Sequence, residues 1–111
     1  MSLAGLDPVI HAPKRLSIMA VLAHSSSTDF TFLKQHLGVS DSDLSKQMSA
    51  LEASGYITVS KSRGRGGTTT YRATRQGRSA FAQHVAALQS IVSDAAASAQ
   101  PSGGRARPST D

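Results

Sequence analysis

Residues Leu33 to Tyr56 read LKQHLGVSDSDLSKQMSALEASGY, and this segment is the most informative about the fold. Its first part carries Leu33 and Leu37 four residues apart, so that both side chains lie on one face of a short helix. Gly38 follows directly and can adopt the left-handed conformation that ends a helix. This part therefore predicts a short helix followed by a tight turn.

A second helix is predicted directly after this turn. Ser40 is a favourable N-cap, and Asp43 places a carboxylate three residues later, near the positive end of the helix. One apolar stripe then recurs at spacings of four and three residues, through Leu44, Met48 and Leu51. Gly55 is expected to end this helix. Together the two helices and their turn form a helix-turn-helix pattern.

The face opposite this stripe is polar, and its side chains are small or able to form hydrogen bonds. It consists of Ser42, Ser45, Lys46 and Ser49, with Gln47 at its flank. The only full charge on this face is the positive charge of Lys46. Such a surface can enter the major groove of DNA. The alternative is an ordinary amphipathic helix pair with a solvated outer face, because helices joined by a turn are common.

The hydrophobic pattern changes after Gly55 from a helical period to an alternating one. Ile57 and Val59 alternate with polar residues, and a second β-branched run extends over residues 68–74. Between these runs lies the basic, glycine-rich segment KSRGRGG at residues 61–67. Two alternating runs around such a segment predict a β-hairpin. An RGG-type RNA-binding segment is an alternative for its tip. A phosphate-binding loop fits less well, because the Gly-Lys-Ser/Thr ending is missing.

The chain is predicted to form one domain between two terminal segments. Residues 1–12 are expected to be an N-terminal arm, in which Asp7 and Pro8 can open a brief helical turn. The domain is expected to span residues 13–99, and its first substantial helix begins at Pro13. A last helix is expected at about residues 75–99, with Thr74 as its cap. Residues 100–111, rich in Pro, Gly and Ser, are expected to be disordered.

The composition favours an anionic partner and excludes several kinds of site. The 111 residues carry a formal net charge of +5, and no acidic residue occurs between Glu52 and Asp94. The absence of cysteine excludes thiolate catalysis and cysteine-based metal sites. The histidines have no ligand spacing and no catalytic pair is apparent, so we expect no enzyme, cofactor or metal site. Without a transmembrane run or a signal peptide, we expect a cytoplasmic, nucleoid-associated protein with no membrane partner.

The order helix, helix, turn, helix, hairpin and long helix resembles the MarR/ArsR-like winged helix-turn-helix transcriptional regulators. The resemblance is strongest to short single-domain members with a long C-terminal dimerisation helix. Two motifs carry it: LGVSDSDLSKQMSALEASGYI at residues 37–57 and TYRATRQGRSAF at residues 70–81. The resemblance implies a mainly α-helical fold with a small β-hairpin wing. The cysteine or histidine clusters of metal-sensing ArsR relatives are missing from this sequence.

The resemblance also implies which residues contact DNA. The helix at residues 41–54 would enter the major groove, and the hairpin at residues 57–73 would form the wing. Lys46 stands where relatives commonly carry an arginine, and lysine is less able to make a bidentate contact with guanine. The expected DNA-binding residues are Ser40, Ser42, Asp43, Ser45, Lys46, Gln47, Ser49, Lys61, Arg63, Arg65 and Arg72.

An apolar stripe on the last helix predicts a homodimer. Its residues recur at spacings of four and three, as in a heptad seam, and a helix of this length outruns so small a domain. The first substantial helix is apolar on two sides and can contribute to the same interface. In the alternative, the long helix packs only on its own domain. The expected interface residues are Leu16, Ile18, Phe81, Val85, Leu88, Ile91, Val92 and Ala95.

These features together predict a sequence-specific regulator of transcription that binds double-stranded DNA. We expect a repressor that acts as a homodimer on a palindromic operator. A crevice at the dimer interface is compatible with a small-molecule effector, although no residue identifies one. The alternative function is that of a winged-helix protein–protein interaction module without specific DNA binding. The acid-free interval from Ala53 to Ser93 argues against that alternative, because docking to a protein does not require it.

Overall fold

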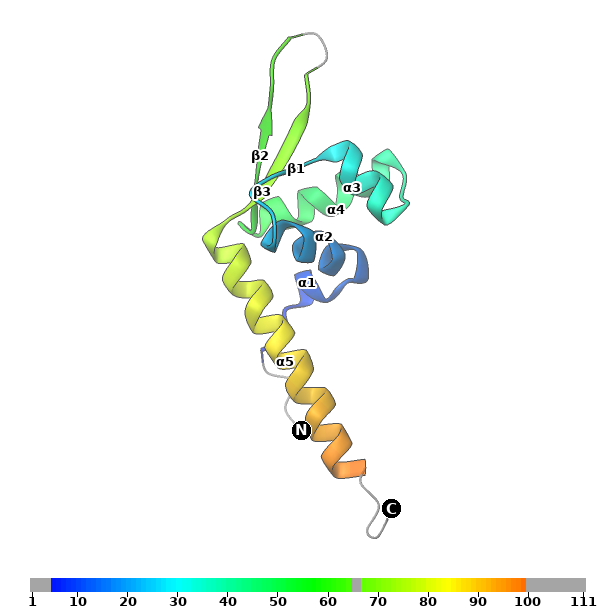
Figure 1. Cartoon of the computed structure of the whole chain (residues 1–111), viewed down its shortest axis with the longest axis vertical. Coiled ribbons are helices and arrows are strands. Elements are labelled where there is room, and N and C mark those ends of the chain that lie inside the picture. The colour runs from blue at the N-terminus through cyan, green and yellow to red at the C-terminus, as the bar shows by residue number, and fades with distance from the viewer. Residues whose placement is uncertain (1–4, 65–66, 100–111) are drawn as a thin grey trace.

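The computed structural model describes residues 5–64 and 67–99, which form five helices and three short strands. The elements are α1 (Pro8–His11), α2 (Pro13–Ala23), β1 (Thr28–Asp29), α3 (Phe30–Leu37), α4 (Asp41–Ala53), β2 (Ile57–Lys61), β3 (Thr69–Ala73) and α5 (Arg75–Ala99). Figure 1 shows the β2–β3 hairpin projecting from one side of the helices and α5 extending on the other. This arrangement confirms the predicted mainly α-helical fold with a small hairpin wing.

The helix-turn-helix pair forms as its sequence predicts. Gly38 ends α3 in the left-handed conformation, with φ of 68°, and its N–H donates to the carbonyl oxygen of Lys34. The side chain of Ser40 then caps α4 by accepting a hydrogen bond of 3.1 Å from the N–H of Asp43. After α4 ends at Ala53, Gly55 has φ of 79° and turns the chain into β2. These turns determine where α4 begins and where the chain leaves it for β2.

The sheet has the strand order β1-β3-β2 and is antiparallel throughout. Strand β2 pairs with β3 through Val59 opposite Tyr71, and β1 adds a short third strand with Thr28 on the other side of Tyr71. Strand β1 is only two residues long, Thr28–Asp29, and has no alternating pattern that would mark it in the sequence. Helix α3 begins at Phe30, because the side chain of Asp29 accepts a hydrogen bond of 2.7 Å from the N–H of Phe32 and caps the helix there.

The core lies where α2, α3 and α4 meet the sheet and the first half of α5. The short helix α1 also belongs to it, since Ile10 is fully buried. The expected boundary between residues 12 and 13 therefore falls inside the packed unit, and residues 100–111 lie outside the described residues. The buried apolar side chains are Ile10, Ile18, Met19, Leu22, Leu33, Leu44, Met48, Leu51, Ile57 and Tyr71.

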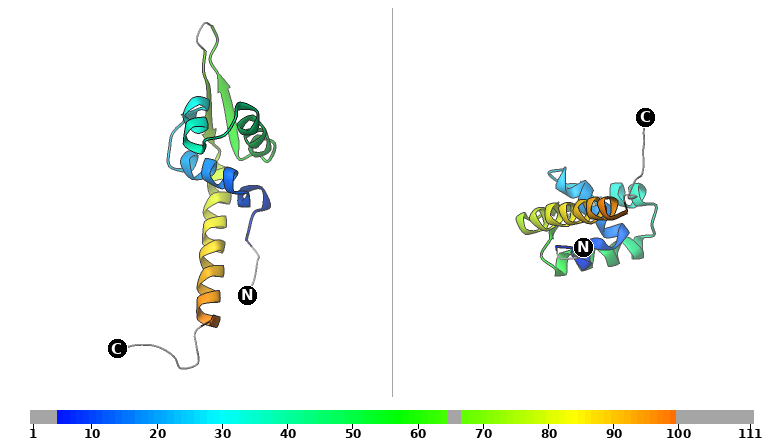
Figure 2. Two further views of the ribbon diagram at one scale, coloured as in Figure 1. Left: turned by 90° about the vertical axis from the view of Figure 1, so that its right-hand side faces the viewer. Right: turned by 90° about the horizontal axis from the view of Figure 1, so that it is seen from below.

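Helix α5 has 25 residues and begins at the predicted cap. The side chain of Thr74 accepts a hydrogen bond of 2.9 Å from the N–H of Gly77. The first half of α5 packs against α2, and His84 on this half is fully buried. Figures 1 and 2 show the second half running away from the other elements, and there Val92 is 67% exposed. Half of this helix thus belongs to the domain core, and half projects from it.

Candidate nucleic-acid interface

The outer face of α4 is formed by four side chains that all lie exposed. It consists of Ser42, Ser45, Lys46 and Ser49. On the opposite side of the same helix, Leu44, Met48 and Leu51 are buried in the core. Burial of this stripe fixes which way the helix faces, so the outer side chains are presented to solvent without distorting the fold. The structure thus brings together the four residues that the sequence places on the outer face.

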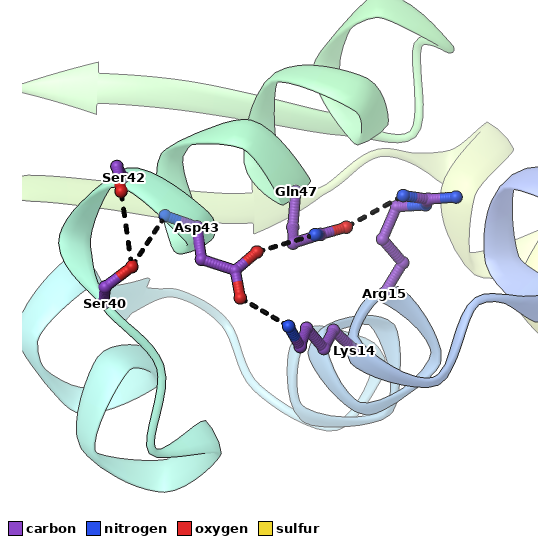
Figure 3. A network of polar contacts seen from close by, with 6 residues as sticks. All are labelled: Lys14, Arg15, Ser40, Ser42, Asp43 and Gln47. Carbon is purple, nitrogen blue, oxygen red and sulfur yellow. Dashed lines mark hydrogen bonds and ion pairs between the residues drawn. The ribbon is translucent and has the colours of Figure 1, made fainter.

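Asp43 and Gln47 are half-buried, and Figure 3 shows their side chains directed toward Lys14 and Arg15 of α2. Gln47 donates a hydrogen bond of 2.9 Å from Nε2 to Oδ1 of Asp43, and Lys14 forms an ion pair with Oδ2 of Asp43. Arg15 donates a hydrogen bond of 2.8 Å to Oε1 of Gln47 and another of 2.6 Å from Nε to the carbonyl oxygen of Val9. This network connects α4 to α2 and α1.

The acidic side chains near the start of α4 are each matched by a cation. The hydrogen bonds from Lys14 and then Gln47 hold the pKa of the Asp43 carboxyl below its ordinary value, so it is ionised at neutral pH. Asp41 forms an ion pair of 2.7 Å with Lys34 of α3. Sequence reasoning missed the role of Lys14 and Arg15. Their position in the first turn of α2, where the helix dipole disfavours cations, was the available signal.

The hairpin presents exposed basic side chains, and Lys61 among them lines a groove beside α4. Lys61, Arg63 and Arg72 are all exposed, whereas Arg65 lies outside the described residues. A groove separates α4 from the hairpin and is lined by Ser45, Met48, Ser49, Glu52, Val59, Lys61 and Tyr71. Glu52 was not among the predicted site residues. It follows Ser49 by three positions and Ser45 by seven, and this helical spacing was the signal that places it on the outer face.

A polar cluster joins the N-terminal segment to α5 and to the residues that follow α4. The N–H of Asp7 donates a hydrogen bond of 3.0 Å to Nδ1 of His84, whose Nε2 lies 3.5 Å from Nδ1 of His11. Tyr56, which follows α4, donates its hydroxyl proton to Oδ2 of Asp7. The other oxygen of Asp7 caps α1 by accepting from the N–H groups of Val9 and Ile10. Sequence analysis missed this cluster because its members lie far apart in the chain.

The buried position of His84 shifts its titration. Burial, assisted by the neighbouring His11, lowers the pKa of His84 below its ordinary value of 6.5, although Asp7 opposes the shift. The hydrogen bond to Nδ1 has the same effect, because that nitrogen must be unprotonated to accept it. For Asp7, burial raises the pKa of the carboxyl, but the hydrogen bonds from Tyr56 and the backbone outweigh it, and the pKa is lowered.

The residues expected at a dimer interface fall into three groups. Val92 and Ala95 are exposed on the projecting half of α5. Ile18 is fully buried and packs with Leu22 in the core of its own domain, so its placement on a surface for a partner is wrong. The reason is helical spacing, since Ile18 and Leu22 share the inner face of α2. The remaining residues are half-buried, and they are Leu16, Phe81, Val85, Leu88 and Ile91.

Two other kinds of site were sought in the part of the chain that the structure describes. Within residues 5–64 and 67–99, no group of three or more metal-ligating side chains is close enough together to hold an ion. None of the described helices combines the length and the apolar character that crossing a membrane requires.

Comparison with solved structures places the fold among transcriptional regulators of the MarR/ArsR type. A transcriptional regulator homologue from Pyrococcus horikoshii OT3 superposes with a TM-score of 0.74 at 20% identity, covering 78% of this chain and 87% of that one. A protein from Salmonella typhimurium assigned as a transcriptional regulator has a TM-score of 0.66 at 19% identity, covering 80% of each chain. A protein assigned to the regulation of arsenical resistance has a TM-score of 0.60 at 25% identity, covering 84% and 94%.

The sequence also matches a family model. No curated protein matches the chain at a significant level. The model of a winged helix DNA-binding domain, however, matches residues 14–92, which extend from the start of α2 to well within α5 and include the whole helix-turn-helix and hairpin. The chain therefore belongs to the family of winged helix DNA-binding domains.

Proposed function

We propose that this DNA-binding transcriptional regulator acts as a homodimer and represses transcription by occupying a roughly palindromic operator. The observation that carries the proposal is the outer face of α4, which is exposed, weakly charged and flanked by basic side chains of the hairpin. A helix with such a face fits the major groove, where base edges are read by hydrogen bonds. The assigned activity is binding, and no catalytic step is part of it.

Two parts of the surface have different tasks in this proposal. Lys46 and the serines of the outer face read base edges, which gives sequence specificity. Lys61, Arg63 and Arg72, together with Arg65 outside the described residues, neutralise phosphates and release counterions, which sets affinity and its salt dependence. Ser40, Asp43 and Gln47 take a supporting role, because their side chains are bonded to α4 itself or to α2.

The dimer is proposed to form through the projecting half of α5. Leu88, Val92 and Ala95 lie on one stripe of this half, and Val92 and Ala95 are exposed. A second copy that packs on the same stripe would remove it from water and give an isologous interface. Two recognition helices then read two half-sites about one helical turn apart. With DNA as its partner, the dimer would act at the nucleoid in the cytoplasm.

Selection of DNA fragments by the protein tests this function. The wild-type chain is mixed with a random duplex pool, bound fragments are amplified over several rounds, and the enriched sequence is then titrated at several salt concentrations. The proposal predicts enrichment of an inverted repeat and an affinity that falls with salt. Failure to bind either the selected pool or random duplex would instead favour a protein–protein interaction module.

A further inference from the structure

Helix α4 carries three carboxylates, and two of them are paired with cations of neighbouring helices. Asp41 lies 2.7 Å from Nζ of Lys34 in α3, and Asp43 is paired with Lys14 in α2. These pairs offset the negative charge at the end of α4 that precedes the outer face. The first half of the recognition helix therefore approaches DNA without an unmatched acidic side chain.

Glu52 is the third carboxylate, and its surroundings differ. It is exposed, and within the described residues it forms no ion pair. It lines the groove between α4 and the hairpin together with Ser45, Ser49 and Lys61. Its charge contributes to a raised pKa of the Tyr71 hydroxyl, after the larger effect of burial, and both residues line this groove. The surface proposed to face DNA thus retains one negative charge.

Stability of the helix does not account for this charge. Glu52 occupies the last turn of α4, which ends at Ala53. A carboxylate at that end is repelled by the partial negative charge of the helix dipole. Glutamate and glutamine have similar helix propensities, so a neutral side chain of the same shape would serve the helix equally well. The helix itself therefore gives no reason for a carboxylate at this position.

The electrostatics of DNA give an exposed carboxylate in this groove a selective effect. Phosphates repel it wherever the protein rests on DNA without specific contacts. In the major groove, exocyclic amino groups can satisfy it, at N4 of cytosine or N6 of adenine. A carboxylate therefore weakens binding to most DNA sequences. This loss of affinity is offset only where a base amino group lies opposite the carboxylate and donates a hydrogen bond to it.

We infer that Glu52 is a specificity-determining residue, which disfavours non-specific contact with phosphates and accepts a hydrogen bond from a base amino group in the operator. The inference rests on the proposed function, because it requires α4 and the hairpin to face duplex DNA. The charge of Lys46 favours binding to any DNA, whereas Glu52, six positions further along α4, opposes binding unless a base amino group faces it.

The test compares Glu52→Gln with the matched control Asp94→Asn. Both substitutions remove one exposed carboxylate without changing its shape, but Asp94 lies on α5, far along the chain from the recognition helix. Affinity is measured for a duplex selected by the wild-type protein and for a shuffled duplex of the same composition. Glu52→Gln is expected to bind the shuffled duplex several-fold more tightly and to lower the specificity ratio about tenfold. Asp94→Asn is expected to leave the ratio unchanged.

A specificity ratio of Glu52→Gln that equals the wild-type ratio would overturn the inference, whether both affinities stay constant or rise equally. Thermal unfolding of the two variants controls for the fold, and Glu52→Gln should melt at the wild-type temperature or slightly above it. A different result would contradict the proposed function itself: the wild-type protein would enrich no DNA sequence, so that no specificity ratio could be measured.

Discussion

Lys46 is the positively charged side chain on the outer face of α4, and we propose that it contacts base edges. Its side chain is exposed and makes no contact with the buried stripe, so Lys46→Ala should leave the fold intact. We expect this variant to bind the selected operator more weakly by about 1–3 kcal/mol, the usual range for one base contact. Fluorescence anisotropy with operator and random duplexes measures this. Equal weakening on both duplexes would assign Lys46 to phosphate contact alone.

His84 gives the fold a pH dependence with a definite sign. Because its pKa is lower in the folded protein than the ordinary 6.5, the unfolded chain binds more protons as the pH falls. The stabilising contribution is therefore complete above pH 6.5 and is lost as the pH falls from there through the folded pKa. The Asp7 carboxyl, whose pKa is also lowered, loses its contribution only in a more acidic range.

Denaturant unfolding at about pH 8 and about pH 5 checks this expectation. The wild-type protein should lose stability between the two conditions, and His84→Gln, which cannot be protonated, should lose less. His36→Gln is the matched control, since His36 is exposed on α3 and should lose as much as the wild type. A loss in His84→Gln as large as that of the wild type would show that protonation of His84 is not responsible.

At the scale of elements, the hairpin is expected to contribute affinity for any DNA. Its exposed basic residues flank a glycine-rich tip and have no role in the core. Replacing both Arg63 and Arg65 by alanine should weaken specific and random binding together. The slope of log affinity against log salt should fall by up to about two units, one for each lost phosphate contact. Arg75→Ala, at the base of the hairpin, serves as the control, and an unchanged slope in the double variant would exclude the tip from the interface.

Elements encoded by local patterns were predictable from the sequence. The stripe at Leu44 and Met48, the cap at Ser40 and the left-handed Gly38 act within a few residues, and all appear in the structure. Strand β1 was not predictable, because two residues carry no period and its conformation comes from pairing with β3. The cap of α3 at Asp29 was not predictable either, since several polar side chains precede that helix.

The candidate site was predictable only in part. The direction of the outer face of α4 follows from its period, but the partners of Asp43 and Gln47 come from α2, about 30 positions earlier in the chain. The burial of His84 arises in the same way, from the docking of the N-terminal segment on α5. Such long-range contacts leave no local pattern in a single sequence, whereas Ile18 was misplaced because α2 is apolar on more than one side.

At the scale of the whole molecule, we propose that specific regulation requires two copies of the chain. One recognition helix spans only a few base pairs, which is too little to select a promoter from the competing sites of a genome. The projecting half of α5 offers the surface for pairing, with Leu88 near its start. Leu88→Glu would place like charges together across the two-fold axis. We expect this variant to remain folded, to sediment as a monomer and to bind the operator weakly.

Sedimentation of the wild-type protein at micromolar concentration, alone and with the selected duplex, tests whether the protein binds DNA as a homodimer. A homodimer predicts a mass of twice 11.6 kDa for the free protein and two chains on each duplex. A mass of 11.6 kDa without DNA, together with one chain or none on the duplex, would contradict the claim.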